Sequence, residues 1–169
     1  MSDIQDRVTE IQAEWARERP ELDVSPMGVI GRLHRLGGFV REELVSVYEE
    51  YGLGEGDFDV LATLRRAGAP FERAPKDLAG HTMVTTGAMT KRIDRLEAAG
   101  LVARRASEQD GRGRVVALTA RGLETIDAAF AHHMDNERRL LATLTAREAA
   151  QLEALLAKWL GAFEQGLRE

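Results

Sequence analysis

The chain has 169 residues, of which 44% are hydrophobic and 30% are charged, a composition typical of a soluble globular domain and not of a disordered or fibrous protein. It contains no cysteine, which excludes disulfides, thiol catalysis, cysteine-ligated zinc and iron–sulfur clusters. No segment approaches the roughly 18 consecutive apolar residues that span a membrane. We therefore expect a cytoplasmic protein with no membrane partner.

The charge is distributed unevenly along the chain. The formal net charge is -5, but the segment 76–121 has nine basic and five acidic side chains. A segment with a local charge of +4 is therefore flanked by acidic sequence. A local basic face is what contact with phosphate requires, so nucleic acid stays a candidate partner despite the acidic total.

The first half of the chain has the apolar periodicity of helices. A short first helix with one apolar stripe is expected to stop before Pro20. Ser25–Pro26 is a typical N-cap and first-turn pair, and it begins a long second helix that ends near Gly52. A third helix ends by Gly68, and a short fourth helix covers 77–80.

The middle of the chain combines a polar-faced helix with a hairpin. In the predicted helix 85–98, the apolar residues share one face, and threonines and basic residues occupy much of the remainder. Two strand-like runs, 101–105 and 113–118, then flank an Asp-Gly turn, which is a hairpin signal. A helix-turn-helix followed by a hairpin is a winged helix.

In a winged helix the second helix of the helix-turn-helix enters the major groove and the hairpin tip reaches a neighbouring minor groove. Arg112 lies between two glycines at the predicted tip and suits the negative potential of a narrow minor groove. The alternatives are a solvated turn for Arg112, helix capping for one of the threonines, and an ion pair with Asp110 for Arg114. The candidate DNA-binding residues are Thr85, Thr86, Thr90, Lys91, Arg95, Arg112 and Arg114.

The C-terminal part is predicted to be helical over 120–144 and again after the capping residue Thr145. The last helix has an apolar stripe that a single winged-helix domain could not cover, formed by Leu152, Leu155, Leu156, Trp159, Leu160, Phe163 and Leu167. A second subunit is the expected cover. The predicted fold is therefore mainly α, a winged helix-turn-helix with a two- to three-stranded β-wing and N- and C-terminal dimerisation helices.

The sequence also resembles a known family over 53–122. The matching segments are DVLATL at 59–64, GAMTKRIDRLEAAGLVAR at 87–104, DGRGR at 110–114 and VALTARG at 116–122. They resemble the MarR family of winged-helix transcription regulators. The resemblance implies a homodimer that binds double-stranded operator DNA of pseudo-palindromic sequence, usually as a repressor, until a small ligand lowers the affinity. It implies a single domain, with N-terminal helices over 1–52, a winged helix over 53–120 and dimerisation helices over 121–169.

The segment 15–27 is similar to the extended N-terminus of the urate-responsive MarR subgroup, the HucR and PecS type. This similarity implies a site for urate or a related purine at Trp15, Asp59, Arg92 and Arg104. An indole can stack on a flat heterocycle, a guanidinium can donate paired hydrogen bonds to an anion, and Asp59 could hold Arg92 until the ligand competes for it.

Several alternatives stay open at this predicted ligand site. Trp15 lies on the apolar stripe of the first helix and could serve packing alone, and Asp59 with Arg92 could be a structural ion pair. Arg105 competes with Arg104 for the inward position. The inducer could be a phenolic or other aromatic acid, or there could be none, with the N-terminal helix strengthening the dimer only.

Other classes of function have weaker support. The histidines are His34, His81, His132 and His133, and the adjacent pair on a helix does not converge on a metal ion. No phosphate-binding loop, nucleophile elbow or zinc-protease motif occurs, so we predict no enzyme, metal or cofactor. A protein-interaction module that has lost DNA binding is disfavoured by the DGRGR segment and the local charge of +4.

Overall fold

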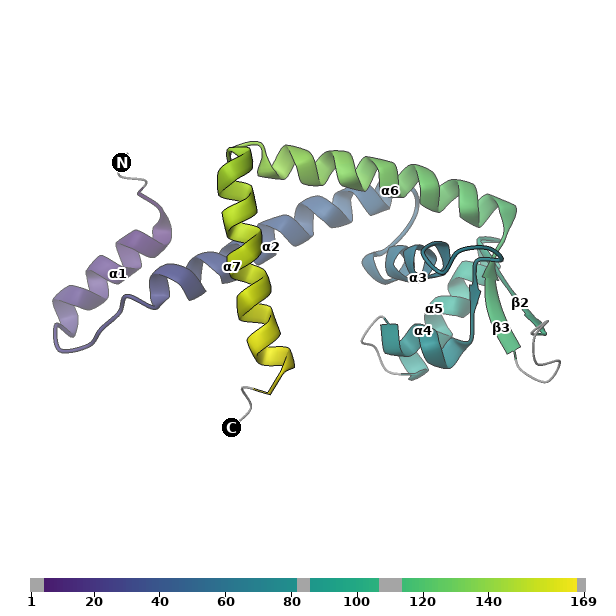
Figure 1. The fold of residues 1–169 in the computed structure, drawn as a ribbon, viewed down its shortest axis with the longest axis horizontal. Coiled ribbons are helices and arrows are strands. Elements are labelled where there is room, and N and C mark those ends of the chain that lie inside the picture. The colour runs from purple at the N-terminus through teal and green to yellow at the C-terminus, as the bar shows by residue number, and fades with distance from the viewer. Residues whose placement is uncertain (1–4, 82–85, 107–113, 167–169) are drawn as a thin grey trace. The chain divides into compact units, whose positions relative to one another are not determined.

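The computed structural model describes residues 5–81, 86–106 and 114–166 (Figure 1). The chain divides into two compact units, Met1–Ser46 and Val47–Glu169, which are described separately. The elements in chain order are α1 Arg7–Glu18, α2 Met27–Glu50, α3 Glu55–Arg65, β1 Glu72–Arg73, α4 Pro75–His81, α5 Thr86–Ala98, β2 Val102–Ala106, β3 Arg114–Leu118, α6 Ala120–Leu141 and α7 Ala146–Glu164.

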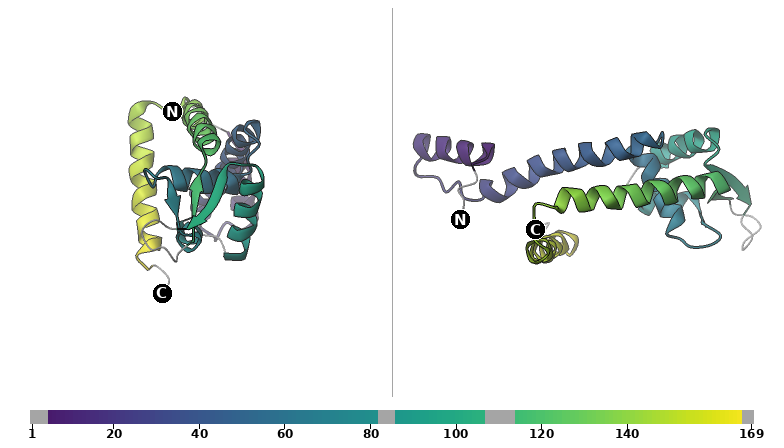
Figure 2. Two further views of the ribbon diagram at one scale, coloured as in Figure 1. Left: turned by 90° about the vertical axis from the view of Figure 1, so that its right-hand side faces the viewer. Right: turned by 90° about the horizontal axis from the view of Figure 1, so that it is seen from above.

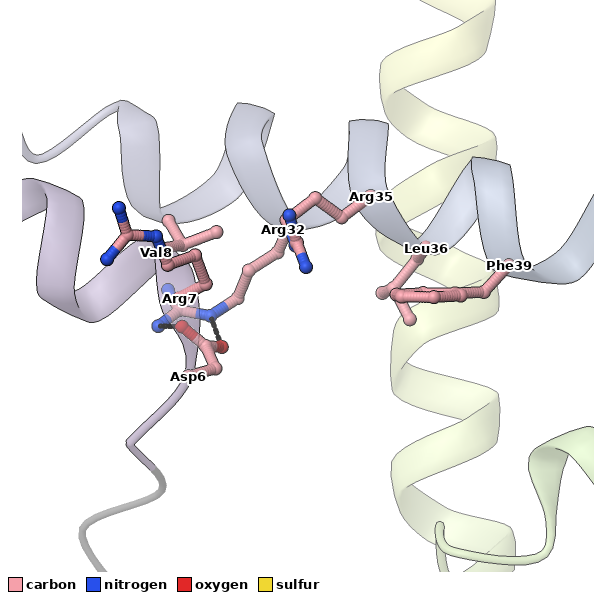
Figure 3. Close-up of a pocket in the computed structure, with 7 residues that line it drawn as sticks. All are labelled: Asp6, Arg7, Val8, Arg32, Arg35, Leu36 and Phe39. Carbon is pink, nitrogen blue, oxygen red and sulfur yellow. Dashed lines mark hydrogen bonds and ion pairs between the residues drawn. The ribbon is translucent and has the colours of Figure 1, made fainter.

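The first unit is formed by α1 and the greater part of α2. Asp6 caps α1 by accepting the N–H of Thr9 at 2.9 Å. The same carboxylate accepts two hydrogen bonds from Arg32 of α2, at 2.7 and 3.1 Å (Figure 3). These bonds lower the pKa of Asp6 to about 2. Because Gly31 has no Cβ, Val8 can approach α2 closely, and a Cβ there would lie 3.1 Å from Val8 Cγ1.

The second unit holds most of the apolar core and the small sheet. Its strands are antiparallel in the order β1-β3-β2, with Ala117 of β3 opposite both Glu72 and Ala103. Fully buried side chains come from α3, α4, α5, α6 and the sheet: Val60, Leu61, Leu64, Leu78, Met89, Ile93, Leu96, Val102, Val116 and Ile126. The predicted mainly helical winged-helix fold is confirmed, and β1 makes the wing sheet three-stranded.

An aromatic cluster joins the last turn of α2 to α3 and α6. The rings of Tyr48 and Phe58 stack with their centroids 4.1 Å apart. The hydroxyl of Tyr48 lies 3.3 Å from Nδ1 of His133, and Phe130 packs nearby. Burial of Tyr48 in this cluster raises its pKa to about 12.

The junction between the sheet and α6 is closely packed. The hydroxyl of Thr119 accepts the N–H of Gly122 at 2.9 Å and donates to the carbonyl of Gly100 at 2.8 Å. A Cβ on Gly122 would lie 1.9 Å from the carbonyl oxygen of Leu101. The first turn of α6 therefore lies directly against the backbone that connects α5 to β2.

Most helix ends agree with the capping signals in the sequence. α1 ends before Pro20, and α2 is continuous through the Gly37-Gly38 pair. The predicted end of α6 at 144 is wrong, since the helix stops at Leu141 and a turn leads into α7. Thr145 begins α7 with a capping box, in which Glu148 accepts the N–H of Thr145 at 2.8 Å.

Two helices present apolar side chains that the single chain leaves uncovered. α7 has no buried residue. The exposed large apolar residues of α2 and α7 are Val29, Ile30, Leu33, Leu36, Phe39, Val40, Leu152, Leu155, Leu156, Leu160 and Phe163. In the described ranges, no helix combines the length and apolar character needed to cross a membrane.

Candidate nucleic-acid interface and ligand site

The outer face of α5 is polar and basic, next to the hairpin. Its buried face consists of Met89, Ile93 and Leu96, all 2% exposed or less, while Thr90 and Lys91 are exposed on the remaining surface. α4 and α5 pack together as the two helices of a helix-turn-helix, and the β2–β3 hairpin follows (Figure 1, Figure 2).

The other predicted DNA contacts are only partly described. Thr86 is the first residue of α5, and Arg114 is the exposed first residue of β3. Thr85, Arg112 and Asp110 lie outside the described residues, and so does the predicted pairing of Asp110 with Arg114. The polar face that the sequence predicts is thus present at Thr90, Lys91 and Arg95.

Arg95 is exposed, and it also forms an ion pair with a buried carboxylate. Its Nε and Nη2 donate to Oδ2 and Oδ1 of Asp57 at 3.1 and 2.5 Å, a bidentate arrangement. The Arg95 side chain is 59% exposed, and that of Asp57 is 7% exposed. The hydrogen bond with Asp57 raises the pKa of Arg95, whose guanidinium is charged at any working pH in any case.

Arg92 and Asp59 lie on facing helices without the direct ion pair expected from the sequence, so the prediction that Asp59 holds Arg92 until a ligand competes is wrong. Among the described residues, no ion pair joins the two side chains, and the guanidinium of Arg92 instead lies on the backbone of α3 at Gly56. Arg92 Nη1 is buried and has no hydrogen-bond partner in the described part of the chain. Partial desolvation, followed by the charge of Glu55, raises the pKa of the exposed Asp59, while the charge of Arg92 acts to lower it.

The two adjacent arginines of β2 pair in different directions. Arg104 forms ion pairs with Asp94 and Glu97 of α5, and Arg105 donates from Nε to Glu72 of β1 at 2.8 Å. The Arg104 side chain is 27% exposed and that of Arg105 is 38% exposed. Arg104 is therefore the one that faces α5, the second helix of the helix-turn-helix and hence its recognition helix, where two carboxylates already hold it.

Trp15 is in the first unit, whereas Asp59, Arg92 and Arg104 are in the second. Trp15 is 46% exposed. The first unit also has a pocket of about 270 Å³ that does not include Trp15 (Figure 3). Its lining consists of Asp6, Arg7, Val8, Arg32, Arg35, Leu36 and Phe39.

The histidine pair on α6 has partners other than a metal ion. His133 is 8% exposed, with Tyr48 at Nδ1 and Glu137 Oε1 at 3.2 Å from Nε2. His132 Nδ1 lies 3.7 Å from Glu50 Oε2. Within the described ranges, no three potential metal ligands converge.

Asp57 is the functional candidate that the sequence analysis missed. It lies in the first turn of α3, where it also accepts the N–H of Gly54 at 3.2 Å. The available signal was an acidic residue three positions after a glycine at a helix start, which is typical of capping. That signal does not indicate a partner 38 positions away.

Comparisons with known proteins agree with this architecture. Residues 51–113 match the model of the MarR family. The transcriptional regulator PecS of Dickeya dadantii is 39% identical over 151 residues, covering 89% of this chain and 91% of that protein. The chain belongs to the MarR family. The resemblance found in the sequence is thereby confirmed at the level of the family.

Two solved MarR family structures share the fold. A mutant MarR from Escherichia coli in complex with operator DNA is 30% identical with a TM-score of 0.68, covering 82% of this chain and 99% of that one. A Mycobacterium tuberculosis MarR family protein in complex with p-aminosalicylic acid is 32% identical with a TM-score of 0.61, covering 78% of this chain and 97% of that one.

Proposed function

We propose that this MarR family protein is a transcriptional repressor that binds a pseudo-palindromic operator as a homodimer and is released by a small anionic aromatic ligand, urate or a related purine. The observation that carries the DNA-binding part is the exposed polar and basic face of α5 beside the wing hairpin. The similarity to MarR in its operator complex supports the same assignment.

In such a dimer, the α5 helices of the two subunits enter major grooves about one helical turn apart, roughly 34–36 Å. Thr90, Lys91, Arg95 and Arg114 are exposed and can contact phosphates and base edges. The proposal also assigns DNA contacts to Thr85, Thr86 and Arg112 on the basis of the sequence. The acidic remainder of the chain limits binding to non-target phosphates.

The ligand part of the proposal rests on Arg92. Its buried Nη1 lacks a partner in the described residues, and a buried donor without a partner is costly. An anionic ligand that accepts from Arg92 relieves this cost and acts directly on α5, the helix that carries Arg92. A ligand that binds better to one orientation of α5 shifts the protein toward that orientation, which is how DNA affinity would fall.

In this proposal Trp15 provides a stacking surface, and Asp59 and Arg104 complete the polar lining. Asp59 keeps its raised pKa beside Arg92, and Arg104 connects the site to two carboxylates of α5. The similarity to PecS supports the subgroup from which this ligand set is taken. The second candidate is a phenolic or other aromatic acid as inducer, which the p-aminosalicylic acid complex of the M. tuberculosis relative favours.

A gel-shift titration at fixed salt tests both parts. Wild-type protein is first used to select duplexes from a random pool, and the enriched sequence becomes the probe, with a scrambled duplex as control. We expect an enriched palindrome, and release of it by urate or xanthine. Failure to enrich any sequence would contradict the DNA-binding proposal, and release only by salicylate-type acids would favour the second candidate.

Isothermal titration with urate locates the ligand. The affinity of the Trp15→Ala, Arg92→Ala double variant for urate should be at least about tenfold lower than that of wild type. This corresponds to a loss of about 1.4 kcal/mol in binding free energy. The matched control is Arg35→Ala, which removes an arginine from the pocket of the first unit and leaves the proposed site intact. Loss of binding in the control with retention in the double variant would move the ligand to that pocket.

A further inference from the structure

The first turn of α3 holds the recognition helix at two points, one helical turn apart. Arg95 forms its bidentate pair with Asp57, and the guanidinium of Arg92 occupies the space above Gly56. A Cβ at Gly56 would lie 2.2 Å from Arg92 Cζ, so this contact depends on the absence of a side chain there.

Asp57 is itself firmly held, which makes it suitable as an anchor. Its side chain is 7% exposed, and Oδ2 accepts the backbone N–H of Gly54 in addition to Arg95 Nε. The carboxylate also lies in the first turn of α3, where the helix dipole favours negative charge. Arg95, by contrast, is mostly exposed and receives its fixed geometry from Asp57.

The apolar core and the ion pair constrain α5 in different ways. Met89, Ile93 and Leu96 fix which face of the helix is buried, but apolar contacts are non-directional and tolerate small rotations of the helix. A bidentate guanidinium–carboxylate pair is planar and directional, so it permits only a narrow range of rotation. The pair thus narrows the orientation in which the outer side chains of α5 meet the DNA.

We propose that Asp57 is a positioning residue for operator recognition, acting through Arg95 on the orientation of α5 without contacting DNA itself. The inference rests on the proposed function, since it assigns the origin of specificity within the same DNA-binding helix. It also changes the role predicted for Arg95, because two of its donors serve Asp57 and only the remainder are available to phosphate or base.

The experiment compares the affinity of each variant for the selected operator and for a scrambled duplex at the same salt. Asp57→Asn keeps an oxygen for the Gly54 N–H and removes the charge that fixes Arg95. We expect the ratio of operator to scrambled affinity to fall about tenfold, the effect of losing one base contact. Removing a carboxylate near DNA by itself raises both affinities together, so an unchanged ratio would overturn the proposal.

The matched control is Asp127→Asn. Asp127 pairs with Arg65 at 2.6 Å and so links α3 to α6, without touching α5. This variant removes the same charge and an α3 ion pair, and it should leave the affinity ratio unchanged. An equal fall in both variants would show a general structural effect and would overturn the positioning role.

A second pair of variants keeps the test valid if Asp57→Asn does not fold. Arg95→Lys retains the positive charge but cannot form the planar bidentate pair. If Arg95 acts by positioning, the ratio falls about as far in Arg95→Lys as in Arg95→Gln, whereas retention of the wild-type ratio in the lysine variant would overturn the proposal. If wild-type protein enriches no operator at all, the proposed function fails before this question arises.

Discussion

At the scale of single residues, Gly56 offers a way to move Arg92 without deleting it. A Cβ at Gly56 would lie 2.2 Å from Arg92 Cζ, and because the guanidinium is the end of a flexible side chain, it can shift aside. We expect Gly56→Ala to change the free energy of unfolding by no more than about 1 kcal/mol, since alanine suits a helix. Ligand affinity should fall at least about tenfold, measured by calorimetry.

The control for this variant is Gly80→Ala. Gly80 is an exposed helical glycine of α4, and a Cβ there would meet nothing within 4 Å. It should leave ligand affinity unchanged. Wild-type ligand affinity in a well-folded Gly56→Ala protein would indicate that the position of Arg92 does not matter for the ligand.

The sequence predicted the partners of individual side chains less completely than it predicted the helices and strands. It placed Thr90, Lys91 and Arg95 on the outer side of the recognition helix, because the apolar period alone fixes which face is buried. It did not predict the pairing of Arg95 with Asp57, since the two residues are 38 positions apart and no periodicity links them. Nor could it choose between Arg104 and Arg105, which alternate along a strand whose two sides both carry carboxylate partners.

At the scale of elements, the junction between α6 and the sheet contains a glycine whose replacement should destabilise the fold, unlike the replacement of Gly56. A Cβ at Gly122 would lie 1.9 Å from the backbone oxygen of Leu101, which cannot move without shifting β2. Gly122→Ala should therefore lower the free energy of unfolding by about 3 kcal/mol, at the upper end of overpacking effects. Denaturant unfolding followed by circular dichroism measures it.

Thr119→Ala at the same junction provides the comparison. It removes the N-cap of α6 and the bond to Gly100, and should lower the free energy of unfolding by about 1–2 kcal/mol without any steric conflict. If Gly122→Ala proves milder than Thr119→Ala, the close approach of α6 to Leu101 is not maintained in solution.

The elements themselves were largely predictable because their ends carry local signals. Gly52, Gly100 and Thr145 mark helix boundaries with backbone freedom or a capping side chain that acts within a few residues, and α2 begins directly after Ser25–Pro26. β1 was not resolved as an element because two residues are too few for alternation to show, and its pairing with β3 joins distant segments. No glycine or proline follows Leu141 closely, so the sequence has no local signal for the end of α6 there.

At the scale of the whole molecule, the apolar residues left exposed on α2 and α7 call for a partner. Scattered exposed apolar residues are normal, but periodic rows of leucine and phenylalanine along two helices are typical of an interface. Leu155 is 65% exposed on α7. Leu155→Asp is harmless in a monomer and costly in a dimer, so we expect the dimer dissociation constant to rise at least about tenfold, measured by sedimentation.

Leu22→Asp is the control. Leu22 is 47% exposed in the segment between α1 and α2, outside the helical rows, and the same change should leave the dimer intact. A wild-type protein that sediments as a monomer, or a Leu155→Asp protein that dimerises like wild type, would contradict the predicted role of α7.

The tight junction at Thr119 and Gly122 has a mechanical consequence. Because α6 is fixed to the hairpin at one end and leads into α7 at the other, its 22 residues act as a lever about 33 Å long. A tilt of about 10° at one end displaces the other by about 6 Å, roughly the pitch of one helical turn. In the proposed dimer, a small change in how two copies pack would therefore be magnified at the wing, and the preferred spacing of the operator half-sites would depend on subunit packing.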